Sequence, residues 1–148
     1  MQENKTHWRR HDFRVNSLHL IIDGLRNSIA ELQKKVNEVH WYDGDWLLEE
    51  TEPIYGLAMI AFQNYIIGSI SDFEGDTKNK HAYYRQDKKL GNFSNTTIEL
   101  IVTLANYAKH QNEGLPFSGT KTILQNFNLT YQDLTYLDDS AIFQGLTY

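Results

Sequence analysis

The chain has 148 residues, of which 41% are hydrophobic, 13% aromatic and 22% charged, and its net charge is −5. This length and balance are typical of one globular domain spanning residues 1–148, and they argue against a disordered or collagen-like protein. Cysteine is absent, which excludes a disulfide framework, a thiolate metal site and a cysteine nucleophile.

The sequence predicts neither a targeting segment nor a membrane span. The basic residues near the N-terminus are not followed by the apolar run that a secretory signal needs. The longest apolar-rich stretch, residues 54–73, is interrupted by Gly, Gln, Asn, Ser and Asp, whereas a bilayer helix takes about 20 predominantly apolar residues. We therefore expect a cytoplasmic protein that has no membrane among its partners.

The first predicted element is a long helix from about residue 11 to about residue 39. Its apolar residues recur at alternating spacings of four and three, which is the pattern of a seam between two helices packed side by side. They are Leu18, Ile22, Leu25, Ile29, Leu32, Val36 and Val39. The cluster at residues 43–45, Asp-Gly-Asp, ends the helical pattern.

A second helix is expected to begin near Glu52. Thr51 suits the N-cap, and Pro53 suits the first turn, where its missing N–H is not needed. The residues that follow are apolar on nearly all sides, which indicates a helix at the centre of a bundle or in a subunit interface. Gln63 and Asn64 interrupt this apolar surface, and each needs hydrogen-bond partners if it is buried.

Residues 74–93 are predicted to form an irregular, basic connection with a short helical turn near residues 83–88. Residues 41–76 hold eight acidic and no basic side chains, whereas residues 77–93 hold five basic and one acidic. The five basic residues are Lys78, Lys80, Arg85, Lys88 and Lys89. Because they are interleaved with aromatic residues, they are the predicted nucleic-acid-binding residues, and a solvated surface connection is the alternative.

Two further helices and a tail complete the prediction. Thr96 and Glu99 have capping-box spacing at the start of a third helix, which ends before Gly114. A fourth, shorter helix is expected from Thr120 to Phe127, and the apolar residues of the tail, residues 134–148, are expected to dock on the bundle. With no strand-like alternation, the fold class is all-α, an antiparallel bundle of about four helices with a docked C-terminal tail.

The third predicted helix carries a polar stripe at spacings of four, three, four and three: Glu99, Thr103, Asn106, His110 and Glu113. A surface helix has such a face without any function, and Lys109 then forms an ordinary surface pair with Glu113. In the functional interpretation, His110 exchanges a proton near neutral pH, Lys109 offsets charge on a phosphate, and Asn106 orients the imidazole. These residue types suit metal-independent cleavage of RNA.

The segment from Leu104 to Glu113, LANYAKHQNE, resembles the late-helix motif of the HEPN superfamily of small helical bundles. In that motif a polar residue is followed, after three residues, by a histidine, and Asn106 and His110 match these positions. The arginine expected two residues before Asn106 is Leu104 here, and Lys109 is the cation nearest the motif. The resemblance implies Asn106 and His110 as catalytic residues, and Lys109 is the candidate catalytic cation in place of the missing arginine. The resemblance also implies RNA as ligand, a homodimer, and a cognate partner protein in a bacterial defence or toxin–antitoxin system.

A second interpretation of the whole chain stays open. It is a non-catalytic interaction module of the same fold, an antitoxin-like or scaffolding partner whose polar stripe is solvated. The missing arginine and the net charge of −5 favour it.

No metal and no other cofactor are expected. Of the six histidines, His7 and His11 alone have a helical spacing of four, and they lie near the N-terminus. No cysteine and no phosphate-cradling glycine loop accompany them.

The three tryptophans, Trp8, Trp41 and Trp46, fall near predicted helix ends. We expect them to be packing residues that close the bundle. Because Trp41 and Trp46 flank an acidic turn, a contact site is the alternative for these two.

Overall fold

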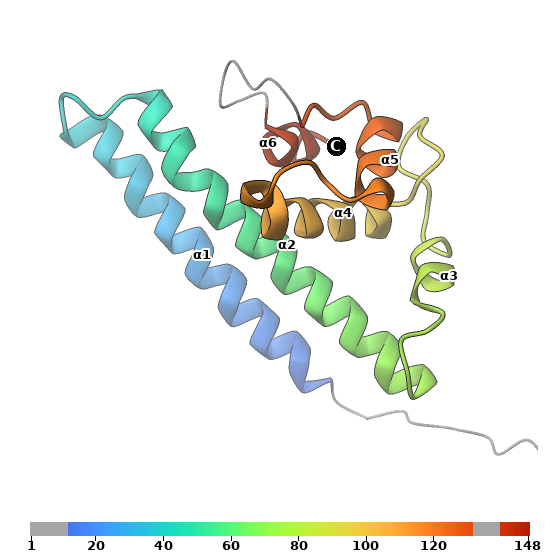
Figure 1. Ribbon diagram of the computed structural model, residues 1–148. Helices are drawn as coiled ribbons and strands as arrows, with labels where there is room; N and C mark the ends of the chain where they lie inside the picture. Colours follow the sequence, from blue (N-terminus) through green and yellow to red (C-terminus); the bar gives the residue numbers. More distant parts are fainter. Residues whose placement is uncertain (1–11, 132–139) are drawn as a thin grey trace, which may run out of the picture.

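The computed structural model describes residues 12–131 and 140–148, and all regular structure within them is helical (Figure 1). The elements are α1 (Phe13–Glu38), α2 (Gly44–Glu74), α3 (Lys80–Tyr84), α4 (Thr97–His110), the 3₁₀ turn η1 (Gln111–Glu113), α5 (Ser118–Asn126) and α6 (Ala141–Gly145). Lys89 and Thr96 form an isolated β-bridge, and the described chain has no strand. The prediction of an all-α fold is confirmed.

Helices α1 and α2 form a long antiparallel hairpin, α5 and α6 lie around α4, and α3 follows the far end of α2 (Figure 1). Helix α2 packs against α1 along one side and against α4 along another, while α5 and α6 cover other sides of α4. At about 1.5 Å per residue, the 31 residues of α2 make a rod of about 46 Å. This rod joins the hairpin turn at one end to α3 at the other.

The start of α2 was predicted near Glu52 and lies at Gly44, so this prediction is wrong. The Asp43 side chain caps the helix by accepting hydrogen bonds from two N–H groups of the first turn, at 3.1 and 3.3 Å. The Thr51 hydroxyl donates instead to a carbonyl one turn earlier, 2.7 Å away, as a threonine inside a helix does. Pro53 lies within the helix on its exposed side, where the carbonyl that loses its N–H partner has access to water.

The other predicted helices are found with smaller shifts. The first helix has nearly the predicted bounds, and the capping box of α4 is formed in both directions between Thr96 and Glu99, at 3.2 and 2.9 Å. Helix α5 begins two residues, and α3 three residues, before the predicted start. Of the predicted tail, residues 140–148 are described, and their helix α6 packs against α2 and α4. Residues 134–139 lie outside the described part of the chain.

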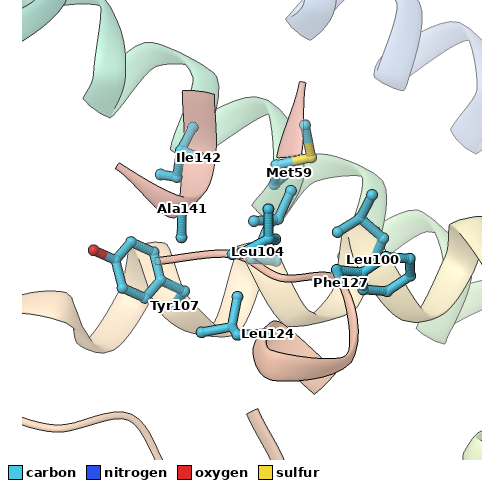
Figure 2. Close-up of a cluster of buried hydrophobic side chains, with 10 residues drawn as sticks. Met59, Leu100, Leu104, Tyr107, Leu124, Phe127, Ala141 and Ile142 are labelled. Atoms are coloured by element: carbon cyan, nitrogen blue, oxygen red, sulfur yellow. The ribbon is translucent and has the colours of Figure 1, made fainter. Parts of the chain in front are cut away.

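The hydrophobic core is centred on α4 and draws side chains from four helices (Figure 2). Its buried members are Met59 of α2, Leu100, Leu104, Ala105 and Tyr107 of α4, Leu124 of α5, Ala141 and Ile142 of α6, and Phe127 and Leu129 after α5. Helix α4 is therefore the centre of the bundle, whereas the apolar pattern of α2 predicted either that place or a subunit interface for α2.

Gly56 lets α2 and α4 approach closely. A Cβ atom at this position would lie 3.0 Å from the Cβ of Ala108 and 3.3 Å from the Ile142 side chain. A larger residue would push the helices apart, so the α2–α4 contact depends on two small side chains facing one another.

The predicted seam of α1 faces α2 but is only half-buried, and none of the described side chains of α1 is fully buried. A groove of about 380 Å³ runs between the two helices. Its apolar lining is Ile22, Leu25, Ile29 and Ala30 of α1 with Ile54, Tyr55 and Ala58 of α2. The hairpin thus keeps apolar surface that the rest of the described chain does not cover.

Within the described residues, α2 is the one helix long and apolar enough to cross a membrane by length and composition. Its most apolar 18-residue window has a mean hydropathy of 1.3, and 22% of that window is buried. Most of the remaining residues are half-buried in the contacts with α1 and α4. A helix packed between two others passes the same test of length and composition.

The α1–α2 turn is fixed by a buried tyrosine. Tyr42 donates a hydrogen bond of 2.6 Å to Glu50, and the Lys35 ammonium lies 3.5 Å from the same carboxylate. Burial and this hydrogen bond raise the pKa of Tyr42 to about 12. The hydrogen bond from Tyr42, with the charge of Lys35, holds the pKa of Glu50 below its ordinary value.

We predict that Tyr42→Phe flattens the pH dependence of stability at both extremes. The lowered pKa of Glu50 stabilises the fold above the ordinary value of 4.5, and this contribution is lost as the pH falls through the lowered pKa. The raised pKa of Tyr42 stabilises the fold below 10 and is lost as the pH rises from 10 to about 12. Urea unfolding of wild type and variant across both ranges measures the difference, and two parallel profiles would contradict the coupling.

Leu104→Ala should destabilise the fold by about 2–5 kcal/mol. The removed atoms lose their transfer free energy, and the cavity that they leave costs the surrounding side chains their contacts. Leu104 is 1% exposed and lies at the centre of the core. Leu20 is 74% exposed on α1, so Leu20→Ala is the matched control and should change stability by less than about 0.5 kcal/mol. Urea denaturation midpoints at equal slope compare the two, and similar losses would mean that α4 is not the centre of the core.

Candidate functional site

A cavity of about 650 Å³ lies between α3, α4 and α5. Its lining includes Glu99, Thr103, Asn106 and His110 of α4, His81 and Tyr84 of α3, Arg85 just after α3, and Phe117, Thr120 and Ile123 at or in α5. The volume falls within the range of about 300–1,000 Å³ found for small-molecule sites. Four of the five residues of the predicted polar stripe therefore line one cavity.

The polar stripe is not an open surface face. Glu99 is 7% exposed and Thr103 is 2% exposed, because η1 turns the chain so that α5 folds back over this side of α4. The sequence pattern gave the correct spacing, but it could not show that a later helix covers the stripe. His110 and Asn106, nearer the end of α4, remain half-buried.

His110 is oriented by a carboxylate. Its Nδ1 lies 2.8 Å from Oε2 of Glu113, and its ring packs edge-to-face on Phe117, with centroids 5.4 Å apart. A carboxylate at Nδ1 favours the tautomer that carries its proton there, which leaves Nε2 as a proton acceptor. Glu113 thus contacts the histidine, and not Lys109 as the surface interpretation has it.

Asn106 and Lys109 are joined through a glutamine of α2. The Gln63 amide nitrogen donates a hydrogen bond of 2.9 Å to Asn106 Oδ1. The Gln63 carbonyl oxygen accepts a hydrogen bond of 2.6 Å from Lys109 Nζ. Gln63 is 3% exposed, so the expectation that it finds hydrogen-bond partners when buried is confirmed, while Asn64 is exposed. Asn106 lines the cavity, but among the described residues it forms no hydrogen bond with the imidazole of His110. Lys109 is not part of the cavity lining.

Of the five predicted nucleic-acid-binding residues, Arg85 lines the cavity. Its Nε lies 3.6 Å from Glu99 Oε1, and three-quarters of its side chain is exposed. Lys78 pairs with Asp76 at 3.6 Å beyond the end of α2. The others are Lys80, which begins α3, and Lys88 and Lys89, which are exposed between α3 and α4.

Two groups of the cavity wall lie deep in the protein. The Glu99 carboxylate accepts hydrogen bonds from the Thr96 N–H and the Asn95 side chain, so it serves first to hold the start of α4. Tyr84 packs with Ile70 and Val102, and its buried hydroxyl has no hydrogen-bond partner among the described residues. Burial raises the pKa of Tyr84.

Sequence reasoning missed the wall that α5 contributes. Phe117, Thr120 and Ile123 carry no local signal for a site, and they reach the cavity because the chain reverses after α4. His81 lies among the basic residues of 77–93, where it carries no local signal for a site either. Only the path of the chain brings its imidazole to the same cavity as His110.

Within residues 12–131 and 140–148, no three histidine, aspartate or glutamate side chains gather as metal ligands would. His7 and His11 lie outside these residues. Comparison of the chain with protein-family models, with curated proteins and with solved structures finds no match.

Gln63→Met should destabilise the protein by about 1–3 kcal/mol, because it leaves Asn106 Oδ1 without its donor while keeping the side-chain volume. Gln125, an exposed glutamine of α5, gives the control substitution Gln125→Met, which should cost less than about 0.5 kcal/mol. Chemical denaturation compares the two variants. Equal effects would mean that the Gln63 bridge does not hold α2 to α4.

Proposed function

We propose that the protein binds RNA in the cavity between α3, α4 and α5 and cleaves it without a metal ion, with His110 as the proton-transfer group. One observation carries the proposal: an imidazole held at Nδ1 by Glu113 lines a nucleotide-sized cavity that an exposed guanidinium, Arg85, also lines. The resemblance to the HEPN superfamily motif at Asn106 and His110 supports it, and the cytoplasm is the location that goes with it.

In the proposed step, His110 Nε2 takes the proton of a ribose 2′-hydroxyl, and the 2′-oxygen attacks the adjacent phosphorus. The bond from phosphorus to the 5′-oxygen breaks, and that oxygen receives a proton from a general acid. His81, the other imidazole of the cavity, is the acid we assign. The products are a 2′,3′-cyclic phosphate and a 5′-hydroxyl, so the reaction balances without a metal or other cofactor.

We assign to Arg85 the role that was predicted for Lys109. The Lys109 ammonium is bound to Gln63, whereas the Arg85 side chain is largely exposed at the cavity and touches Glu99 at 3.6 Å. A guanidinium donates two parallel hydrogen bonds to a phosphate, which an ammonium does not. We assign the flanking lysines to the phosphates of neighbouring nucleotides; these are Lys78, Lys80, Lys88 and Lys89.

The second candidate function is a non-catalytic interaction module, and Leu104 favours it. This residue stands where the motif has arginine, and it is buried in the core. A guanidinium at that place would be buried among apolar side chains at a large cost in free energy, so the fold of this chain favours leucine there over the motif's arginine.

A homodimer belongs to the proposal. It is implied by the resemblance, and the groove between α1 and α2 offers apolar surface for it. Sedimentation of the full chain distinguishes a dimer from a monomer.

We predict that the full chain cleaves end-labelled RNA in EDTA, and that His110→Ala lowers the cleavage rate by about 10²–10⁴-fold, the usual contribution of a positioned acid or base. Glu113→Gln should lower the rate less, because the imidazole keeps its place against Phe117. The fragment upstream of the cut should carry a 2′,3′-cyclic phosphate at its new 3′ end. Single-stranded and structured RNA are both used as substrates.

The matched control is His19→Ala, which removes an exposed histidine of α1. It should cleave as the wild type does. Unchanged cleavage by His110→Ala would indicate a contaminating nuclease, and no cleavage by the wild type on either RNA would contradict the catalytic proposal. In that case, RNA binding that Arg85→Ala weakens would still support the cavity as an RNA site.

A further inference from the structure

The turn between α1 and α2 exposes two tryptophans. Trp41 is 69% exposed and Trp46 is 48% exposed, so the expectation that they close the bundle is wrong for these two, while Trp8 lies outside the described residues. Their rings meet edge-to-face with centroids 6.1 Å apart and an interplanar angle of 83°, which makes one continuous aromatic surface. Tryptophan is among the residues most enriched where proteins bind one another.

A buried tyrosine beside the tryptophans fixes this turn. Tyr42 is buried, contacts the Trp41 ring edge-to-face and donates a hydrogen bond to Glu50. Asp43 caps α2 and accepts a hydrogen bond from the backbone N–H of Trp46. Since the turn is already ordered, a partner would lose little conformational entropy in the protein by binding here.

The surroundings of the tryptophans are acidic. Residues 38–52 hold six carboxylates and no lysine or arginine. Glu50 and Asp43 are engaged in the turn, but Asp45 and Glu49 are exposed and form no ion pair with any described residue. The surface therefore combines aromatic rings with carboxylates that pair with no cation of the described residues.

We propose that this surface, defined by Trp41, Trp46, Asp45 and Glu49, docks a basic segment of a partner protein. Arginine and lysine bind the faces of indole rings and pair with carboxylates, so one such segment satisfies both features. The turn contains a contact of this type already, since Lys35 Nζ lies 5.4 Å from the centre of the Tyr42 ring. RNA and anionic lipid carry the wrong charge for it.

The docking surface does not depend on the proposed RNA site. It lies at the start of α2, whereas the cavity is lined by α3, α4 and α5. Helix α3 follows the opposite end of α2 (Figure 1). Loss of either site should leave the other intact.

Fluorescence anisotropy of a labelled octa-arginine peptide with the full chain tests the proposal. Trp41→Ala/Trp46→Ala keeps the charge and should weaken binding by about tenfold, as the loss of two exposed cation–π contacts would. Asp45→Asn/Glu49→Gln should weaken it to a similar extent. Asp23→Asn/Glu31→Gln removes the same charge from the exposed face of α1 and should change binding less than about twofold.

Circular dichroism should show all three variants folded, since every substituted side chain is exposed. Unchanged binding by the tryptophan variant, or an equal loss of binding in the α1 control, would overturn the proposal. Either result would mean that the peptide binds through the overall negative charge and not at this surface. Self-association of the wild type that the tryptophan variant abolishes would also overturn it, because the occupant would then be a second copy of this chain.

Discussion

The structure depends on the burial of α4. Seven of its fourteen residues are buried, and α2, α5 and α6 each owe their position to a contact with it. A helix covered on several sides has little solvent-exposed surface, so each buried polar group on it needs a hydrogen-bond partner within the protein. The capping box at Glu99 and the amide bridge from Gln63 meet this requirement at two levels of the helix.

The same constraint generates the cavity. Where α5 folds back over α4, the polar stripe is enclosed but not filled, and the side chains toward the end of α4 keep access to solvent. His110 is the last residue of α4, so Glu113 reaches its Nδ1 from the turn that follows. A histidine placed earlier in the helix would be buried like Thr103. Position along one helix thus separates structural polar residues from those available for chemistry.

The sequence was sufficient where the signal is local. Periodic apolar residues predicted α1, and the spacing of Thr96 and Glu99 predicted the start of α4, because caps and helix periods are properties of neighbouring residues. It was misleading where two local signals competed: Thr51 and Pro53 resemble a helix start, but Asp43 offered an earlier cap and a proline on an exposed side is tolerated. The contacts of Arg85 and Gln63 with the α4 stripe lie beyond any local pattern, since they join segments far apart in the chain. The same holds for the place of His81 in the cavity.

The net charge of −5 conceals an uneven distribution that bears on function. The acidic turn before α2 and the basic segment after it are separated by a helix of about 46 Å, several times the Debye length of about 8 Å at physiological ionic strength. The carboxylates of the turn are therefore screened from an anion beside Arg85, which follows the far end of α2. By the same screening, a cationic partner at the turn does not feel Arg85. The length of α2 thus keeps an acidic and a basic segment of one small protein from cancelling each other's charge.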